Sequence, residues 1–495
     1  MILCLFYYTL SDKYECMNKK PFYITTTLPY VNAEPHVGFA LEIIRADSIA
    51  RWKKAQGYDV FFNTGTDEHG QKLFESAQKS GKKVKEYVDE YALKFKDLLQ
   101  VLGISSDIHF IRTTDTHHEK AAQEFWKRVS DNGFIYKKNY KTKYCVGCEL
   151  EKKDSDLVDG KCPLHPNRDL EIREEENYFF KFSQCGDALL AYYDAHPHFV
   201  VPQFRLNEMR EFIKRGLEDF SISRLASKMS WGIPVPGDTD HVMYVWFDAL
   251  VNYISTLGWP EDTKTFNHFW KEGTPTQYCG KDNTRFQAVM WQAMLLAAKL
   301  PFTHTVVVNG FVTGDGGVKM SKSLGNVINP CDVVREYGSE ALRYFVTREV
   351  SSFEDSPFTM DRFKASYNSG LANGIGNMVS RVMKMASLHV VAPVTMSQDM
   401  PREYVEAMNA FDLHSAMEQV MSLVARVDAT IQEKAPFKLV KTDKEKAQEI
   451  ITSLCRDVYT IGLMLEPIMP ETSEKIRTVV KGNSMPSEPL FLRKE

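Results

Sequence analysis

Hydrophobic and polar residues near the start of the chain follow the pattern of a strand, a helix and a second strand. Phe22–Thr27 alternates and is rich in β-branched and aromatic residues, which predicts a strand. After two prolines, residues 36–56 place apolar side chains at helical spacing. The stretch "YDVFFNTGTDEHG" at 58–70 predicts a second strand that ends in a glycine turn. Strand, helix and strand joined by short links begin a parallel α/β sheet.

The middle of the chain interrupts this pattern and later resumes it. Residues 82–102 and 113–133 have the periodicity of amphipathic helices. From Tyr136 to about Gln203 the periodicity is lost, and turn residues, charges and a Cys/His group dominate. The apolar run "HTVVVNG" at 304–310 then predicts a buried parallel strand. We therefore expect one parallel sheet divided by an insertion.

The last part of the chain is helical from about residue 360, with breaks near 392–401 and at Thr442. This pattern predicts a separate all-α bundle. The helix at 371–385 has one apolar face that should be buried, formed by Leu371, Ile375, Met378 and Val382. On an adjacent face Asn377 and Arg381 lie four residues apart, hence side by side.

Composition adds limits to this outline. The 495 residues are enough for about three domains. The formal net charge of −4 means that a polyanionic partner must be held by local patches. Nine cysteines, mostly scattered, argue against a disulfide framework and for a reducing, cytoplasmic compartment. No stretch has the apolar length of a membrane helix, and we expect residues 1–16 to be a dispensable, disordered extension before Met17.

The stretch "YCVGCELEKKDSDLVDGKCPLHP" has the spacing of a metal knuckle. It presents Cys145-x2-Cys148 and, thirteen residues later, Cys162-x2-His165. Three thiolates and an imidazole suit one tetrahedral Zn²⁺ ion. Four protein ligands leave no open position, so we expect a structural site rather than a catalytic one.

A possible phosphate site lies at the start of the predicted helix 36–56. A helix N-terminus offers unpaired N–H groups and the positive end of its dipole. Gly38 permits close approach of a phosphate, and His36 can donate to its oxygens. By itself this is a weak signal, because a histidine that opens a helix is more often a cap or a surface residue.

The segment "KMSKS" at 319–323 is more specific. It follows the predicted strand 304–310 and four glycines that supply hinge freedom. Lys319 and Lys322 can place ammonium groups on a triphosphate and neutralise the charge that develops on a departing pyrophosphate.

These segments together resemble the methionyl-tRNA synthetase family of class I aminoacyl-tRNA synthetases, in its form with a single zinc knuckle. The resemblance covers nearly the whole chain from Met17 and rests on "YITTTLPYVNAEPHVG", "GTDEHG", "YCVGCE", "EENYFF", "YVWFDAL", "GKDNTRFQ", "VVVNGF" and "KMSKSLGN". It implies a Rossmann-type parallel-sheet catalytic domain split by a zinc-binding connective insertion, then an all-α anticodon-binding bundle. The expected segments are an extension (1–16), the first catalytic half (17–112), the insertion (113–215), the second half with the stem-contact segment (216–358) and the anticodon domain (359–495).

The resemblance also implies the activity. The chain would activate methionine with ATP, as its Mg²⁺ complex, and transfer it from the adenylate to tRNA(Met), initiator tRNA included. The implied partners are therefore methionine, ATP and tRNA(Met), with one structural zinc ion and no membrane. Because the chain ends after the bundle at Glu495, we expect a monomer.

Site residues follow from the matched motifs. His36, Gly38 and Lys322 would contact the ATP phosphates, and Lys281 and Asp282 would lie beside the adenylate. Asp67 would hold the methionine amino group, in a cleft also lined by Leu28, Tyr30, Arg224, Trp246 and Gln287. A thioether needs aromatic and apolar walls, which tyrosine and tryptophan supply. Asn377 and Arg381 would read the anticodon.

Three positions depart from the family pattern. Phe39 stands where a second histidine is usual, so one donor on the ATP side is absent. Gln287 stands where many relatives have histidine near the substrate sulfur, and its amide can still donate. Phe437 replaces a tryptophan expected to stack on an anticodon base, which keeps a π-face with less area and predicts weaker anticodon binding.

Three alternatives compete with this interpretation. A synthetase for leucine, isoleucine or valine would carry a large editing domain, and the insertion spans only about a hundred residues. A non-catalytic relative that binds tRNA would be expected to lose Asp67 or Lys322, and both are present. A zinc-stapled binding module without nucleotide chemistry would leave "KMSKS" unexplained.

Overall fold

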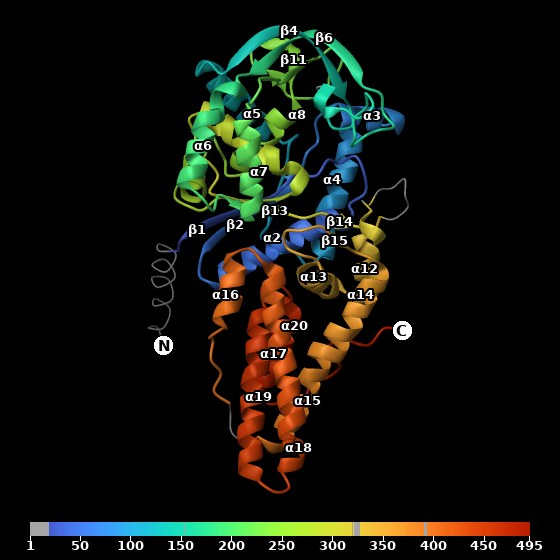
Figure 1. Ribbon diagram of the computed structural model, residues 1–495, viewed down its shortest axis with the longest axis vertical. Helices are drawn as coiled ribbons and strands as arrows, with labels where there is room; N and C mark the ends of the chain where they lie inside the picture. Colours follow the sequence, from blue (N-terminus) through green and yellow to red (C-terminus); the bar gives the residue numbers. More distant parts are fainter. Residues whose placement is uncertain (1–18, 153, 319, 321–326, 391–393) are drawn as a thin grey trace, which may run out of the picture. The chain divides into compact units, whose positions relative to one another are not determined.

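A computed structural model describes residues 19–495 apart from 153, 319, 321–326 and 391–393 (Figure 1). The chain divides into two units. The first comprises the described residues as far as Pro35, together with Tyr58–Leu98 and Asp107–Val308. The second comprises His36–Gly57, Leu99–Ser106 and Asn309–Glu495.

A six-stranded sheet forms the centre of the first unit. Its strand order is β3-β2-β1-β12-β13-β7, where the strands are β1 (Pro21–Thr26), β2 (Asp59–Thr66), β3 (His109–Arg112), β7 (Val200–Val201), β12 (Thr276–Gly280) and β13 (Thr305–Asn309). The strands predicted at 22–27, 58–66 and 304–310 are confirmed as β1, β2 and β13. β1 pairs in parallel with β2 on one side and with β12 on the other. The strand order reverses between β1 and β12, and parallel α/β sheets bind ligands in the crevice outside the carboxyl ends of the strands at such a point.

Two helices predicted on either side of β3 are present. The first is α4 (Val84–Val101) and the second is α5 (Thr116–Asp131). α5 buries Ala122, Phe125 and Trp126, and these side chains belong to the apolar core of the first unit. The helical periodicity at 113–133 therefore identified the face that packs inward.

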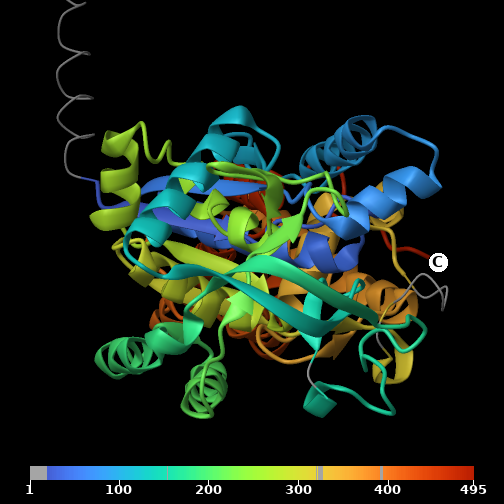
Figure 2. The same cartoon turned by 90° about the horizontal axis from the view of Figure 1, so that it is seen from above.

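The region without periodicity contains a long antiparallel hairpin. β4 (Ile135–Cys145) pairs with β6 (Glu171–Phe180), and β5 (Leu150–Lys152) and β8 (Phe220–Ser221) complete the sheet. The two long teal and green strands lie side by side in Figure 2. Consecutive residues of β4, Lys137 to Asn139, are all exposed, so both faces of this stretch meet water. Alternation of apolar and polar residues, the usual sequence signal of a strand, is absent for that reason.

Helix α2 (Val37–Ala55) of the second unit confirms the helix predicted at 36–56, but its polar residues are not at a solvated face. Arg45 and Asp47 are 1% and 0% exposed. The Arg45 guanidinium donates to the carbonyl oxygens of Val346, at 2.8 and 3.1 Å, and of Val350, at 2.7 Å. Buried charges persist when they are paired and hydrogen-bonded, so these two residues fix α2 to the segment 343–352.

The helical part of the second unit consists of long helices packed side by side (Figure 1). They include α15 (Asn377–His389), α17 (Leu413–Lys434), α19 (Lys444–Leu465) and α20 (Pro470–Lys481). The predicted apolar face is confirmed, since Leu371, Ile375, Met378 and Val382 are all fully buried. The predicted break at Thr442 lies between α18 (Pro436–Leu439) and α19.

Among the described residues, no helix combines the length and the apolarity needed to cross a membrane.

Candidate functional site

Several predicted site residues gather at the carboxyl edge of the sheet in the first unit. Leu28 and Tyr30 follow β1, Asp67 follows β2 directly, and Lys281 and Asp282 follow β12. Parallel strands deliver the residues after their carboxyl ends to one edge. The sheet order thus brings together segments that are up to 250 residues apart, as shown by the Thr27 N–H that donates to the Tyr278 carbonyl at 3.1 Å.

Asp67 is a buried carboxylate in this crevice. Its backbone N–H donates to the Pro29 carbonyl at 3.0 Å, and its carbonyl accepts from the Val31 N–H at 3.4 Å. The residue is 2% exposed, and its Oδ1 has no hydrogen-bond partner in the part of the chain that the structure describes. Burial, followed by the nearby carboxylates of Asp248 and Glu149, raises the pKa of Asp67 well above its ordinary value. Such a group favours a cationic ligand.

Two histidines keep the neighbouring Asp248 ionised. His69 Nδ1 lies 3.3 Å from Asp248 Oδ2, and His118 Nε2 lies 4.0 Å from Oδ1. Burial opposes ionisation of Asp248, but His69 and His118 hold its pKa below the ordinary value, and Asp248 raises the pKa of His69. The charge of Asp248 is therefore compensated within the protein, whereas that of Asp67 is not.

Aromatic rings form one wall beside Asp67. Tyr30 forms an isolated parallel bridge with Asp67, and its ring meets Trp246 edge to face with centroids 6.1 Å apart. Trp246 in turn stacks on Phe286 at 3.8 Å. Leu28, 8% exposed, lies on the same strand-to-loop segment as Tyr30. This wall has the shape and polarity that an unbranched thioether requires.

Gln287 follows Phe286 and is fully buried. Its amide nitrogen donates to the Tyr253 hydroxyl, and its Oε1 has no partner among the described residues. The Gln287 amide thus follows Phe286 of the aromatic wall in sequence, and one of its two N–H donors is engaged by Tyr253. The predicted contact with a substrate sulfur stays a prediction.

Arg224 lies between two tyrosines, and its predicted place beside the substrate stays a prediction. Its guanidinium is 4.9 Å from the Tyr144 ring and 4.8 Å from the Tyr244 ring, and it donates to the Ser223 carbonyl at 2.6 Å. Burial raises the pKa of Glu149, and the positive charge of Arg224 opposes this rise. The two residues line a small cavity together.

Glu149 is the site residue that the sequence analysis did not identify. It is 1% exposed, and its Oε2 accepts from the Tyr30 hydroxyl at 2.6 Å while its Oε1 accepts from the Lys72 N–H at 2.9 Å. The sequence feature that could have identified Glu149 is its position in "YCVGCE", directly after a predicted metal ligand. Nothing in the local pattern shows that this carboxylate reaches a tyrosine 119 residues earlier.

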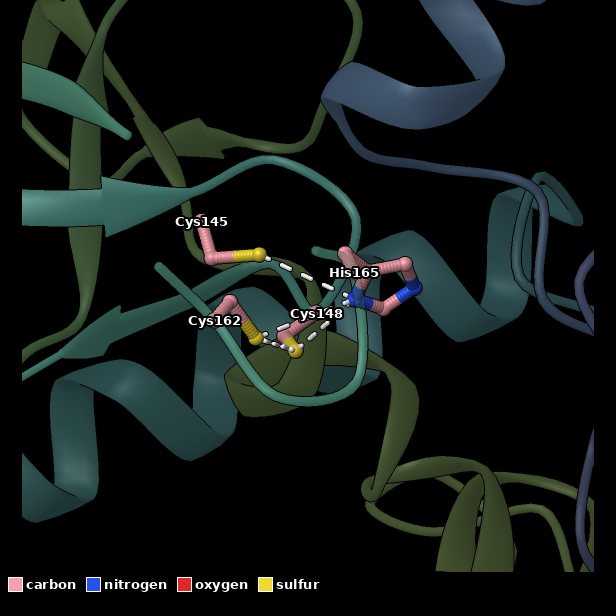
Figure 3. A group of neighbouring side chains, drawn as sticks. All are labelled: Cys145, Cys148, Cys162 and His165. Carbon is pink, nitrogen blue, oxygen red and sulfur yellow. Dashed lines mark hydrogen bonds between the residues drawn. The ribbon is translucent and has the colours of Figure 1, made fainter. Parts of the chain in front are cut away.

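The four predicted metal ligands form one cluster (Figure 3). The ligand atoms of Cys145, Cys148, Cys162 and His165 all lie within 4.8 Å of one another. Cys148 Sγ is 3.4 Å from Cys162 Sγ and 3.2 Å from His165 Nδ1. Zn–S and Zn–N bonds of about 2.3 and 2.0 Å require ligand separations of this size in a tetrahedron. The donor set therefore fits a closed Zn²⁺ site.

In the second unit, His36 caps α2. Its backbone is extended, and its Nδ1 accepts from the Gly38 N–H at 3.0 Å. A Cβ on Gly38 would lie 2.7 Å from the His36 ring, so glycine is needed for this cap. Because Nδ1 accepts, the neutral ring carries its proton on Nε2, which is a donor. Lys319 and Lys322 lie outside the described residues.

The predicted anticodon pair lies on α15. Asn377 is exposed, and Arg381 Nη1 lies 2.7 Å from Asp428 Oδ1 on α17. Phe437 belongs to α18, which packs on α19, and its ring is 48% exposed. The structure thus pairs Arg381 with a carboxylate, which the sequence did not predict, and leaves a large part of the Phe437 ring open to solvent.

Two family profiles match the chain over almost its entire length. A profile described as "tRNA synthetases class I (M)" matches residues 22–169 and 153–383. A second, described as "Anticodon binding domain of methionyl tRNA ligase", matches residues 393–488.

Individual proteins agree with these profiles. The methionine–tRNA ligase of Thermotoga maritima is 40% identical over 486 residues, which are 94% of this chain and 76% of that protein. That of Caldanaerobacter subterraneus subsp. tengcongensis is 40% identical over 475 residues, or 92% and 73%. Among solved structures, Mycobacterium tuberculosis methionyl-tRNA synthetase in complex with methionyl-adenylate superposes with a TM-score of 0.86 at 33% identity. That match covers 96% of this chain and 100% of the other.

Proposed function

The chain belongs to the methionyl-tRNA synthetase family, and from that premise we propose how its own residues divide the reaction. It is a methionine–tRNA ligase, which joins methionine to AMP at the expense of ATP and then transfers it to tRNA(Met), initiator tRNA included. The buried Asp67 carboxylate beside an aromatic wall is the observation that supports this substrate most directly.

We assign the amino acid to the crevice of the first unit. Asp67 binds the α-ammonium group, which supplies the counter-charge that the protein does not. Leu28, Tyr30 and Trp246 bound the thioether side chain, with Gln287 at its far end. Arg224 faces the same cleft, where its positive charge also acts on the Glu149 carboxylate.

ATP-side residues act by positioning and charge stabilisation. A methionine carboxylate oxygen attacks the α-phosphate of Mg²⁺–ATP, and pyrophosphate leaves with its negative charge. His36 Nε2–H binds phosphate oxygens where Gly38 permits their close approach, Lys319 and Lys322 stabilise the departing pyrophosphate, and Lys281 and Asp282 flank the adenylate. In the second step a ribose hydroxyl of the tRNA attacks the mixed anhydride and AMP leaves. No side chain forms a covalent intermediate.

The cysteine and histidine cluster supports one structural zinc ion. Zn²⁺ would be held by Sγ of Cys145, Cys148 and Cys162 and by Nδ1 of His165. Bound there it would cross-link the two turns of the knuckle and take no part in the chemistry.

Substituting Gly147 tests this zinc site. A Cβ at this position would lie 2.5 Å from the His165 ring, so Gly147→Ala should displace the histidine and lower the zinc content from about one ion per chain towards zero. Metal analysis of the purified, dialysed protein gives the readout. Gly186→Ala is the matched control, because its Cβ would meet only Ile213 at 3.7 Å. Full zinc content in Gly147→Ala would contradict the proposed ligand set.

Anticodon recognition is assigned to Asn377, Arg381 and Phe437. Asn377 and the part of Arg381 not engaged by Asp428 offer donors and acceptors to base edges. The exposed Phe437 ring offers a stacking surface.

Arg381→Ala should therefore separate the two half-reactions. We expect kcat/KM for tRNA charging to fall by about tenfold or more, since one charged contact contributes about 1.5–3 kcal/mol, while methionine-dependent pyrophosphate exchange keeps its wild-type rate. Steady-state charging and exchange assays measure the two. The control is Arg402→Ala, which removes an exposed arginine of α16 (Arg402–Asn409) paired with Glu406. Equal losses in both reactions would contradict an anticodon role.

We also propose the bounds of the domains, the oligomeric state and the cellular compartment. We place the catalytic halves at 17–112 and 216–358, the connective insertion at 113–215 and the anticodon domain at 359–495. We propose that the enzyme acts as a monomer in the cytoplasm.

Pyrophosphate exchange tests the function as a whole. The zinc-loaded protein should incorporate labelled pyrophosphate into ATP in the presence of methionine. Leucine, isoleucine and valine are the controls and should support at most about one hundredth of that rate. A preference for any of the three over methionine would refute the proposed substrate.

A further inference from the structure

The Glu149 side chain bridges the zinc knuckle and the methionine pocket. It follows Cys148 directly, and both of its carboxylate oxygens are engaged, one by the Tyr30 hydroxyl at 2.6 Å and one by the Lys72 N–H at 2.9 Å. Its carbonyl accepts from the Tyr244 hydroxyl at 2.8 Å. Side chain and main chain are thus both held, in a residue that is 1% exposed.

Backbone geometry explains why this position depends on the knuckle. Glu149 adopts a φ of +51°, which L-residues rarely adopt without external support. Gly70 packs against the Glu149 carboxylate, since a Cβ on Gly70 would lie only 2.7 Å from Glu149 Oε1. Gly70 itself has a φ of +105°. Both backbones are therefore shaped so that this carboxylate reaches the pocket wall.

We propose that Glu149 is a positioning residue for methionine recognition, which fixes the Tyr30 ring in the pocket through its hydrogen bond to the Tyr30 hydroxyl. This inference rests on the proposed methionine pocket and deepens it. Tyr30 forms the edge-to-face contact with Trp246, so the orientation of its ring sets the wall of the pocket, while its backbone is bridged to that of Asp67.

The hydrogen bond is of a strong kind. The Tyr30 hydroxyl and Glu149 Oε2 are 2.6 Å apart, which is the separation of a short hydrogen bond. Without this bond the Tyr30 ring keeps its packing but loses the contact that holds its hydroxyl at Glu149. Binding of methionine would then include the cost of ordering the ring, which raises KM more than it lowers kcat.

A purely structural role for Glu149 is the competing explanation. Through Lys72 the same carboxylate supports the first turn of α3 (Gln71–Lys79). Loss of that contact would lower stability or zinc content and would not depend on the Tyr30 hydroxyl.

The test is a double-mutant cycle of Glu149→Gln and Tyr30→Phe in zinc-loaded enzyme, read as KM and kcat for methionine in pyrophosphate exchange. An amide has one acceptor oxygen for the two donors that the carboxylate serves. Each single change should raise KM for methionine by about tenfold, with kcat and KM for ATP changed less than twofold. Because both changes remove the same bond, the double variant should have a KM for methionine no higher than that of the more impaired single variant.

Two further variants show whether the effect is specific to the hydrogen bond between Glu149 and Tyr30. Glu75→Gln makes the same change on α3, where Glu75 accepts from Gln71 at 3.0 Å, and should leave KM for methionine unchanged. Glu149→Asp keeps the charge but withdraws the carboxylate by one carbon, and should raise KM as Glu149→Gln does. Zinc content and the thermal transition are measured for each variant.

Two results would overturn the proposal. One is an unchanged KM in both Glu149 variants, and the other is an effect of Glu149→Gln that multiplies with that of Tyr30→Phe. Neither could be confused with failure of the proposed function, because wild-type enzyme must first show methionine-dependent exchange.

Discussion

Asp67→Asn should lower kcat/KM for methionine by about 10²- to 10⁴-fold, which corresponds to losing one partner of a buried ion pair at about 3–5 kcal/mol. The side chain is nearly isosteric, so the crevice keeps its shape. What disappears is a buried carboxylate whose Oδ1 has no hydrogen-bond partner among the described residues. KM for ATP should change little, because Asp67 lies on the amino acid side.

The reaction should also depend on pH through Asp67. Burial and the carboxylates of Asp248 and Glu149 raise its pKa well above the ordinary value. An ammonium binds the carboxylate and not the acid, so kcat/KM for methionine should fall as the pH decreases below that raised pKa. Asp67→Asn should remove this dependence from what activity remains.

Stability should change in the opposite sense. The unfolded chain ionises Asp67 at its ordinary pKa, so the folded protein loses stability as the pH rises from there through the raised pKa. Asparagine cannot ionise, and the variant should unfold at neutral pH in at least as much urea as the wild type. Pyrophosphate exchange from pH 5 to 8 and urea unfolding measure the two effects. An unchanged kcat/KM in Asp67→Asn would refute the assigned role.

Asp47→Ala should destabilise the protein by about 3–5 kcal/mol, since it leaves a buried arginine without its counter-charge. Asp47 Oδ2 lies 2.6 Å from Arg343 Nη2 and 2.8 Å from Arg51 Nε, while Oδ1 accepts from the Ser105 hydroxyl at 2.6 Å. Asp47 and the Arg343 side chain are 0% and 1% exposed. Burial opposes ionisation of Asp47, yet Arg343 and Arg51 keep its pKa below the ordinary value.

Urea unfolding of the whole protein measures this loss of stability. The matched control is Glu406→Ala, which removes an exposed ion pair with Arg402 in the same unit and should cost less than about 1 kcal/mol. If both substitutions had equal effects, the buried pair would not be what holds α2. Because His36 caps α2, loosening of this helix should also weaken binding of the ATP phosphates.

Local patterns were sufficient for the features that depend on residues close in sequence. The alternation in Phe22–Thr27 gave β1, the apolar run before Asn309 gave β13, and the periodicity around Met378 gave a buried helix face. The spacing of the knuckle predicted a cluster that the structure confirms, because its two pairs of ligands lie within a few residues of each other. Motifs placed Asp67 and Tyr30 at the sheet edge for the same reason, since each follows a strand.

Other features depend on charges whose partners are distant in sequence. Arg45 and Asp47 lie between the apolar positions of their helix, and only their partners at 343–352 and Ser105 explain why they are buried. The β4–β6 hairpin showed no alternation, because lysines and glutamates pair across it in water, as Lys141 and Glu174 do at 3.5 Å. Arg381 likewise has a partner, Asp428, that its own helix does not supply.

The sequence by itself thus determined many of the elements, which four residues form the Cys/His cluster and which strand ends carry the candidate substrate residues. Only the tertiary structure decided that Glu149 reaches Tyr30 and that the charge of Asp248 is compensated while that of Asp67 is not. The physical reason is that periodicity and spacing report the environment of a residue relative to its neighbours along the chain. A hydrogen bond or an ion pair depends on distances of about 3 Å between segments that the fold alone brings together.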